Sequence, residues 1–296
     1  MIQQILNKIK IFNSIKQQKK KLLKSVRQNG EALYYANYEF QSDKQIVLAA
    51  VKKDGRALQY ASEYLKNDKD VVLTAVKQSG HALEFASEEL RNDKEIVLEA
   101  IKKYVSALEY ASEELRNNKE VVLKAVKQNG YALCCASEKL KADKEIVLEA
   151  VKQNGNGLEY ASEELKNDKE IALKAITQNG CSLMFVSKEL KFDKMIVFEA
   201  VKQNSYALEY ASKSLQMDKD IVFEALRKNK FSLDYVNKEM PEYKEILYML
   251  KEFLKENKEN FPVEYGMLKN YEREDKLKEG LRLKNKNKLN ILRQKI

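Results

Sequence analysis

Apolar residues return to the same place every 25 residues along most of this chain. Within one period they fall at helical spacing, as at Ile96, Val97, Ala100 and Ile101, which predicts a short helix with one apolar face. A second run with the same spacing follows after a turn, in one case as Ala82, Leu83, Ala86 and Leu90. Each period therefore predicts two short amphipathic helices.

Three residue types mark this period. An aspartate recurs at Asp43, Asp68, Asp93, Asp143, Asp168, Asp193 and Asp218, and Asn118 breaks the series. An alanine recurs without exception at Ala50, Ala75, Ala100, Ala125, Ala150, Ala175, Ala200 and Ala225. A leucine recurs at Leu33, Leu58, Leu83, Leu108, Leu133, Leu158, Leu183, Leu208 and Leu233. The sequence thus contains eight clear units from Asp43 to residue 242, preceded by a degenerate one from Gln18 to Ser42.

Polar residues predict where the helices begin and end. Asn92, followed three residues later by Glu95, has the spacing of a capping box, in which side chains satisfy the free amides of the first helical turn. Asn-Gly pairs such as Asn129-Gly130 follow the first helix in four units. Because glycine adopts the left-handed conformation readily, we expect it to end that helix.

A two-helix unit cannot bury its apolar face alone, so consecutive units must stack. The fold class predicted is an all-α solenoid of about nine 25-residue helix–turn–helix repeats with helical caps, elongated and curved. We expect residues 1–17 to form an N-terminal capping helix and residues 18–242 the solenoid. We expect residues 243–261 to form a C-terminal capping helix, and residues 262–296 to form a basic tail that is helical or partly disordered.

The unit sequence resembles a known repeat. Asp143 to Leu165 reads DKEIVLEAVKQNGNGLEYASEEL, which is similar to a short helical repeat catalogued only as a domain of unknown function, and the resemblance covers about residues 18–242. It implies a tandem helical repeat without an established catalytic activity, and it transfers no functional residues. The chain departs from the pattern at Tyr104-Val105, Ser205 and Lys230, where Asn-Gly or Gly is expected.

The charges are divided between the ends and the middle of the chain. The net charge of the 296 residues is +9, but residues 1–30 carry eight Lys/Arg and residues 280–296 carry six, with no acid in either stretch. The remaining middle is therefore net −5. With 44% hydrophobic residues, 9 Gly and 2 Pro, the chain is neither disordered nor collagen-like. An acidic body with basic ends disfavours a uniformly cationic nucleic-acid binder.

The cysteines and the hydropathy pattern favour a cytoplasmic protein. Cys134 and Cys135 are adjacent, Cys181 stands alone, and no Cys-x-x-Cys pair occurs, so we expect a reducing compartment. The first twelve residues alternate apolar with polar residues, unlike a signal peptide. No stretch approaches the 18 consecutive apolar residues that indicate a membrane-spanning helix.

Little in the sequence indicates catalysis. The chain has one histidine, His81, at a turn position held by unrelated residues elsewhere. No phosphate-binding glycine loop, His-Glu-x-x-His motif or metal-spaced Cys/His cluster occurs, so we predict no enzyme, no cofactor and no metal. Cys134-Cys135 replaces the Glu-Tyr of other units, and we interpret Cys135 as filling the space of the lost tyrosine.

Two periodic rows could bind a partner. Cations near the end of the first helix form a ladder at Lys52, Lys77, Lys102, Lys127, Lys152, Lys202 and Arg227. They also complement the helix dipole, which needs no ligand. The most variable position of the unit, after the Gly site, forms a second row at Arg56, His81, Ser106, Tyr131, Asn156, Cys181, Tyr206 and Phe231. We refer to these as the lysine ladder and the variable row.

These rows support two hypotheses. The first is a non-enzymatic scaffold whose edge or concave face, through the variable row, binds another protein. The low divergence among units indicates recent duplication, which suits a regulator or inhibitor in a host–parasite conflict. The alternative is an RNA- or DNA-binding repeat protein that uses the lysine ladder and the basic end at Arg282, Lys284, Lys286 and Lys288. The partner's identity and the oligomeric state do not follow from the sequence.

Overall fold

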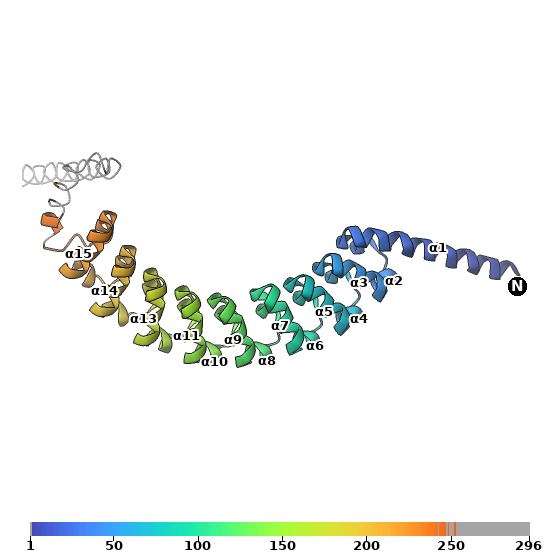
Figure 1. Cartoon of the computed structure of the whole chain (residues 1–296), viewed down its shortest axis with the longest axis horizontal. Coiled ribbons are helices and arrows are strands. Elements are labelled where there is room, and N and C mark those ends of the chain that lie inside the picture. The colour runs from blue at the N-terminus through green and yellow to red at the C-terminus, as the bar shows by residue number, and fades with distance from the viewer. Residues whose placement is uncertain (1, 242, 247, 249–251, 253–296) are drawn as a thin grey trace, which may run out of the picture.

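The computed structural model describes residues 2–241, 243–246, 248 and 252, and over these residues the chain is an α-helical solenoid without strands. Nine 25-residue units, numbered here 1 to 9 from residue 18, stack side by side into an open arc (Figure 1). The predicted all-α repeat fold is therefore confirmed. Longer helices line the inner, concave side of the arc, and shorter helical segments form its outer, convex side.

Units 1 to 8 each contain three kinds of helical segment, and the described part of unit 9 contains the first two of them. The ten-residue helices are α3 (Lys44–Lys53), α5 (Lys69–Gln78), α7 (Lys94–Lys103), α9 (Lys119–Gln128), α11 (Lys144–Gln153), α13 (Lys169–Gln178), α14 (Lys194–Gln203) and α15 (Lys219–Lys228). The six-residue 3₁₀ helices are η1 (Gly30–Tyr35), η2 (Gly55–Tyr60), η3 (Gly80–Phe85), η4 (Val105–Tyr110), η5 (Gly130–Cys135), η6 (Gly155–Tyr160), η7 (Gly180–Phe185), η9 (Ser205–Tyr210) and η11 (Lys230–Tyr235). The short segments on the convex side are α2 (Tyr38–Gln41), α4 (Glu63–Lys66), α6 (Glu88–Arg91), α8 (Glu113–Arg116), α10 (Glu138–Lys141), α12 (Glu163–Lys166), η8 (Leu190–Phe192) and η10 (Leu215–Met217).

The expected second helix of each unit is thus two segments rather than one. In unit 3, Ala86 and Ser87 between η3 and α6 have extended backbones, and the Ser87 hydroxyl accepts a hydrogen bond from the amide of Leu90. Serine in this role starts a new helix instead of continuing the old one. The Ser87 amide donates to the carbonyl of Lys66 in the preceding unit (3.0 Å), so the break also ties neighbouring units together.

The first helix begins one residue later than predicted. Asp93, not Asn92, is its N-cap, because the Asp93 carboxylate accepts hydrogen bonds from the amides of Glu95 (2.9 Å) and Ile96 (3.3 Å). Asn92 instead ends α6 and donates from its side chain to Glu114 in the next unit (3.0 Å). The proposed capping box at Asn92 and Glu95 is therefore wrong, and both polar positions have specific roles.

The glycines after the first helix are needed for close approach, not for a left-handed turn. No residue of the described chain has a positive φ, so the predicted left-handed cap at Asn129-Gly130 is wrong. Asn129 is extended, and a Cβ added to Gly130 would lie 2.2 Å from the carbonyl oxygen of Ala150 in the next unit. Glycine at this position lets the 3₁₀ helix of one unit rest closely on the long helix of the following one.

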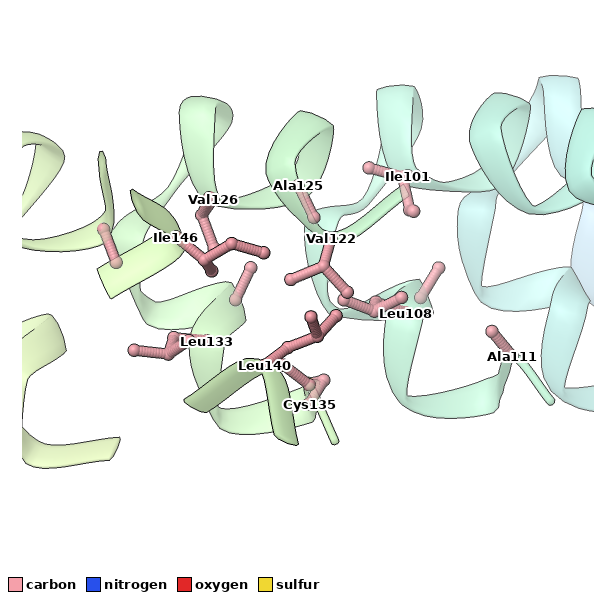
Figure 2. Close-up of a cluster of buried hydrophobic side chains, with 14 of the residues drawn as sticks. Ile101, Leu108, Ala111, Val122, Ala125, Val126, Leu133, Cys135, Leu140 and Ile146 are labelled. Atoms are coloured by element: carbon pink, nitrogen blue, oxygen red, sulfur yellow. The ribbon is translucent and has the colours of Figure 1, made fainter. Parts of the chain in front are cut away.

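One apolar core runs through the stack. The alanines of the period and the leucines of η1 to η7 and η9 are almost completely buried, and Figure 2 shows this layer in unit 5 with Val122, Ala125 and Leu133 facing the space between the two sides. Most of the aromatic residues that follow the leucines, such as Tyr160, are half-buried and pack against the core without being enclosed by it, whereas Tyr35 is exposed. Burial raises the pKa of the Tyr160 hydroxyl, with Glu159 as a second cause.

The two ends of the solenoid differ. Helix α1 (Ile2–Gln28) is one continuous 27-residue helix without a break at residue 17, and its second half serves as the long helix of unit 1. Its first half projects away from the stack instead of folding over unit 1, with Ile11 and Phe12 exposed (Figure 1). The predicted C-terminal cap at 243–261 lies mostly, and the basic tail at 262–296 entirely, outside the described residues.

Candidate partner-binding site

Aspartates and lysines of the period interlock consecutive units. One oxygen of Asp168 caps α13 through the amides of Glu170 and Ile171, and the other lies 2.8 Å from the Nζ of Lys144 in the unit before. The same arrangement recurs at Lys44–Asp68, Lys69–Asp93, Lys119–Asp143, Lys169–Asp193 and Lys194–Asp218. The Lys144 hydrogen bond lowers the pKa of Asp168, so this carboxylate stays ionised at neutral pH. These acidic and basic residues hold the stack together.

The lysine ladder lies in the last turn of the long helices, on the concave side of the arc, and Thr177 takes the place of the cation in α13. Four of its seven members pair with a glutamate three residues earlier, at Glu99–Lys102, Glu149–Lys152, Glu199–Lys202 and Glu224–Arg227. Lys52, Lys77 and Lys127 have no ion-pair partner within the described part of the chain. Part of the ladder's positive charge is therefore neutralised within the protein. The tail cations Arg282, Lys284, Lys286 and Lys288 lie outside the described residues.

Shallow grooves separate the long helices on the concave side, and the groove between α14 and α15 is the most apolar of those described. It has a volume of about 690 Å³ and is lined by Met195, Phe198 and Phe223. The side chain of Met195 is 74% exposed and that of Phe223 is 41% exposed. We call these three residues the apolar trio.

Paired charges border this groove. The Lys194 ammonium lies 2.6 Å from the carboxylate of Asp220, and the Arg227 guanidinium lies 2.8 Å from that of Glu224. The rim groups thus satisfy each other, whereas the apolar trio in the middle has no covering partner within the described chain. An apolar centre with a polar rim is the usual anatomy of a protein–protein interface.

The same groove in other units is less apolar. Between α11 and α13 the corresponding positions are Glu145, Leu148 and Leu173, in a groove of about 510 Å³. Methionine replaces an acid, and phenylalanine replaces leucine, only toward the C-terminal end of the stack. The apolar trio is therefore a local feature superimposed on the repeat.

The variable row lies at the start of the 3₁₀ helices, and its members differ in what they contact. Asn156 donates to the Tyr131 hydroxyl of the preceding unit (3.3 Å) and accepts from Asn179 of the following one (2.8 Å). His81 stacks on the ring of Tyr104, with 3.7 Å between ring centroids. These three positions help to join units, so the row is not simply an exposed turn.

The rest of the variable row is mixed. Arg56, Ser106 and Tyr206 are exposed, while Cys181 is half-buried and its sulfur accepts a hydrogen bond from Asn204 (3.3 Å). Phe231 lies in η11, and its side chain is outside the described part. The variable row and the lysine ladder belong to different elements, separated by the turn after each long helix. They are two surfaces rather than one composite site.

The described residues hold no cluster typical of metal chemistry. No group of three or more His, Cys, Asp and Glu side chains in this part of the chain is placed to bind a metal ion. Over the same residues, no helix has both the length and the apolar character needed to cross a bilayer. Neither observation adds a second candidate site.

The repeat identifies the class of protein: a tandem α-solenoid built from short units. The family model described as Domain of unknown function (DUF4116) matches residues 19–66, 43–91, 68–116, 93–141, 143–191 and 193–240, and the chain belongs to that family. No curated protein and no solved structure is significantly similar to the chain.

The apolar trio was not among the residues predicted from the sequence. A signal was present, because Met195 interrupts a row that is acidic in Glu95, Glu120, Glu145, Glu170 and Asp220. The variable row drew attention by its diversity, whereas the trio departs from the unit pattern at positions that are otherwise uniform. A departure of that kind at an exposed position is the stronger indication of binding.

Proposed function

We propose that the protein is a non-enzymatic scaffold that binds another protein on the concave face of its solenoid. The partner's main anchor is the groove between α14 and α15, and binding regulates or inhibits that partner. The observation that carries this proposal is the exposure of the apolar trio within a rim of mutually paired charges. Large apolar side chains at the centre of a contact supply most of its binding energy.

The charges support a protein partner over a polyanion. Much of the lysine ladder is paired with glutamates on the same helices, which reduces the attraction of this face for phosphates. A groove floor of methionine and phenylalanine needs an apolar partner surface. Nucleic-acid binding through the lysine ladder and the basic ends is the alternative function. Affinity capture at high salt distinguishes it from protein binding. The cytoplasm is our proposed location, because three unbridged cysteines suit a reducing compartment.

The test is affinity capture from the native source with a variant that restores the repeat pattern. Met195→Glu with Phe223→Leu removes two members of the trio but installs residues that equivalent positions already hold, so the fold should be retained. We expect the wild-type chain to keep one stoichiometric protein through a high-salt wash. The double variant should retain it at least about tenfold less well, since loss of one anchor typically costs over 1 kcal/mol.

The matched control is Tyr64→Glu on the convex side. Tyr64 is exposed, and glutamate holds the equivalent position in several units, so this variant also restores the pattern. It should retain the partner as the wild type does. Equal loss in both variants, or no loss in the double variant, contradicts the groove as the anchor. Recovery of nucleic acid that elutes with salt, without a stoichiometric protein, supports the alternative function.

A further inference from the structure

A pair of adjacent cysteines lies at the junction between units 4 (93–117) and 5 (118–142). The sulfur atoms of Cys134 and Cys135 are 3.2 Å apart, Cys134 is exposed, and Cys135 is 9% exposed. In most other units these positions hold an acidic residue and an aromatic ring. Figure 2 places Cys135 beside Leu140 at the convex side of the core, so the pair connects solvent to the interior.

The surroundings of the pair are open. A surface pocket of about 730 Å³ extends across the junction on the convex side, with Arg116 and Asn117 of unit 4 on one side. Cys134 and Lys139 of unit 5 line the other side. A small oxidant can therefore reach the Cys134 sulfur directly.

The same junction lacks two contacts that most other junctions have. Val105 stands where most units have the glycine that admits the next long helix, and Asn118 replaces the aspartate that would pair with Lys94. Within the described residues Lys94 pairs with Glu120 alone (2.5 Å), whereas Lys69 pairs with both Asp93 and Glu95. Helices α7 and α9 touch along much less of their length than other neighbouring long helices, and Figure 1 shows the wider separation between them.

We propose that Cys134 and Cys135 form a thiol oxidation site, where a peroxide converts the pair to a vicinal disulfide and so loosens the junction between units 4 and 5. The thiolate of Cys134 attacks one peroxide oxygen, an S–O bond forms, and the O–O bond breaks. The second oxygen leaves and takes up a proton. The Cys135 proton then passes to the hydroxyl on the Cys134 sulfur, the resulting Cys135 thiolate attacks that sulfur, the S–S bond forms, and the hydroxyl leaves as water.

The two thiols have different roles in this step. Burial raises the pKa of the Cys135 thiol to about 12, with its neighbour Cys134 as a further cause, so Cys135 remains protonated until the second attack. Overall the pair loses two electrons and two protons, which the peroxide accepts. The disulfide ties the Cys135 sulfur to the exposed Cys134 side chain and withdraws it from its place beside Leu140. A vacated core position weakens the packing around it.

The test treats the full chain, carrying Cys181→Ser to remove the third thiol, with hydrogen peroxide. We expect the intact mass to fall by two hydrogen atoms, the change to map to the peptide with both cysteines, and dithiothreitol to reverse it. Amide hydrogen exchange in α9 should become several-fold faster, while exchange in α13 stays unchanged. Phenylarsine oxide, which binds adjacent thiols together, should label the reduced chain and block the oxidation.

Two control variants separate the disulfide from other oxidation. Cys134→Glu with Cys135→Tyr restores the unit pattern, and Cys134→Ser leaves only the buried thiol; neither should lose two hydrogen atoms or bind the arsenical. Three results each overturn the proposal: stable addition of oxygen to Cys134, a disulfide between two chains, or a vicinal disulfide without faster exchange in α9. Because partner capture is measured separately, failure here leaves the proposed scaffold function unaffected.

Discussion

Two junctions of the solenoid are built from the same repeat but make different contacts. Between units 6 and 7, Gly155 rests against the carbonyl oxygen of Ala175, and Lys144 pairs with Asp168 across the boundary. Helices α11 and α13 lie close together there. This junction has the complete set of contacts that the 25-residue period supplies.

Between units 4 and 5 both contacts are altered at once. Val105 occupies the glycine position. Asn118 caps α9 through the amide of Val121 alone, and because its side chain is neutral it forms no ion pair with Lys94. A solenoid is stabilised by each unit and by the contacts between neighbours. The comparison teaches that a single junction can make fewer contacts while the units on both sides keep their fold.

The largest expected effect comes from making the complete junction resemble the weak one. In Gly155→Val, the new Cβ would lie 2.3 Å from the Ala175 carbonyl oxygen and 2.7 Å from the Ser182 hydroxyl. Backbone cannot yield by that amount without separating the units. We expect the free energy of unfolding to fall by about 3 kcal/mol, measured by urea denaturation.

Gly157→Ala is the matched control in the same 3₁₀ helix. A Cβ there would meet the carbonyl oxygen of Gly130 at 3.2 Å, a contact that a small shift relieves, and alanine holds the equivalent position at Ala132. Its stability should stay within about 1 kcal/mol of the wild type. If Gly155→Val unfolds at the same urea concentration as the wild type, the close approach of the two units does not require glycine at this position.

A smaller effect is expected from the aspartate that caps and pairs. Asp168→Ala removes both the cap of α13 and the partner of Lys144, and we expect the free energy of unfolding to fall by about 1–2 kcal/mol. Asp168→Asn keeps an oxygen for the cap and should lose less than about 1 kcal/mol, since a partly exposed ion pair contributes little. Equal losses in the two variants, by urea denaturation, would assign the whole effect to the ion pair.

The sequence predicted the class of fold because the 25-residue period is uninterrupted. It did not predict the internal geometry of a unit. The pattern placed Ala86 and Ser87 inside one continuous helix, although serine also often begins a helix. The hydrogen bond from the Ser87 amide to the preceding unit favours the break over the continuous helix. The role of Gly130 was missed for a similar reason: its close neighbour, Ala150, belongs to the next unit, so no local pattern reveals the contact.

The candidate site was less predictable than the fold. The lysine ladder lies on the last turn of the long helices other than α13, but its pairing with glutamates, as in Glu224–Arg227, depends on side-chain geometry. The exposure of Phe223 depends on the curvature of the whole stack, which leaves one side of each long helix open. The binding roles of the variable row and the ladder stay predictions.

The smallest effect is expected from restoring the weak junction with Asn118→Asp. The new carboxylate should accept a second amide hydrogen bond and pair with Lys94, as Asp168 does with Lys144, and raise the free energy of unfolding by about 0.5 kcal/mol.

In Asp168 and Asp193 the lysine hydrogen bond is the first cause that lowers the pKa below the usual 3.8. A lowered folded-state pKa gives stability that is present above the unfolded value and lost as the pH falls through the folded value. The gain from Asn118→Asp should therefore be complete at neutral pH and decline below about pH 4. Amide exchange should report it as slower opening of α9, with α13 unchanged as the internal control. A gain that persists unchanged at pH 2 would show that the cap, rather than the charge, distinguishes the two junctions.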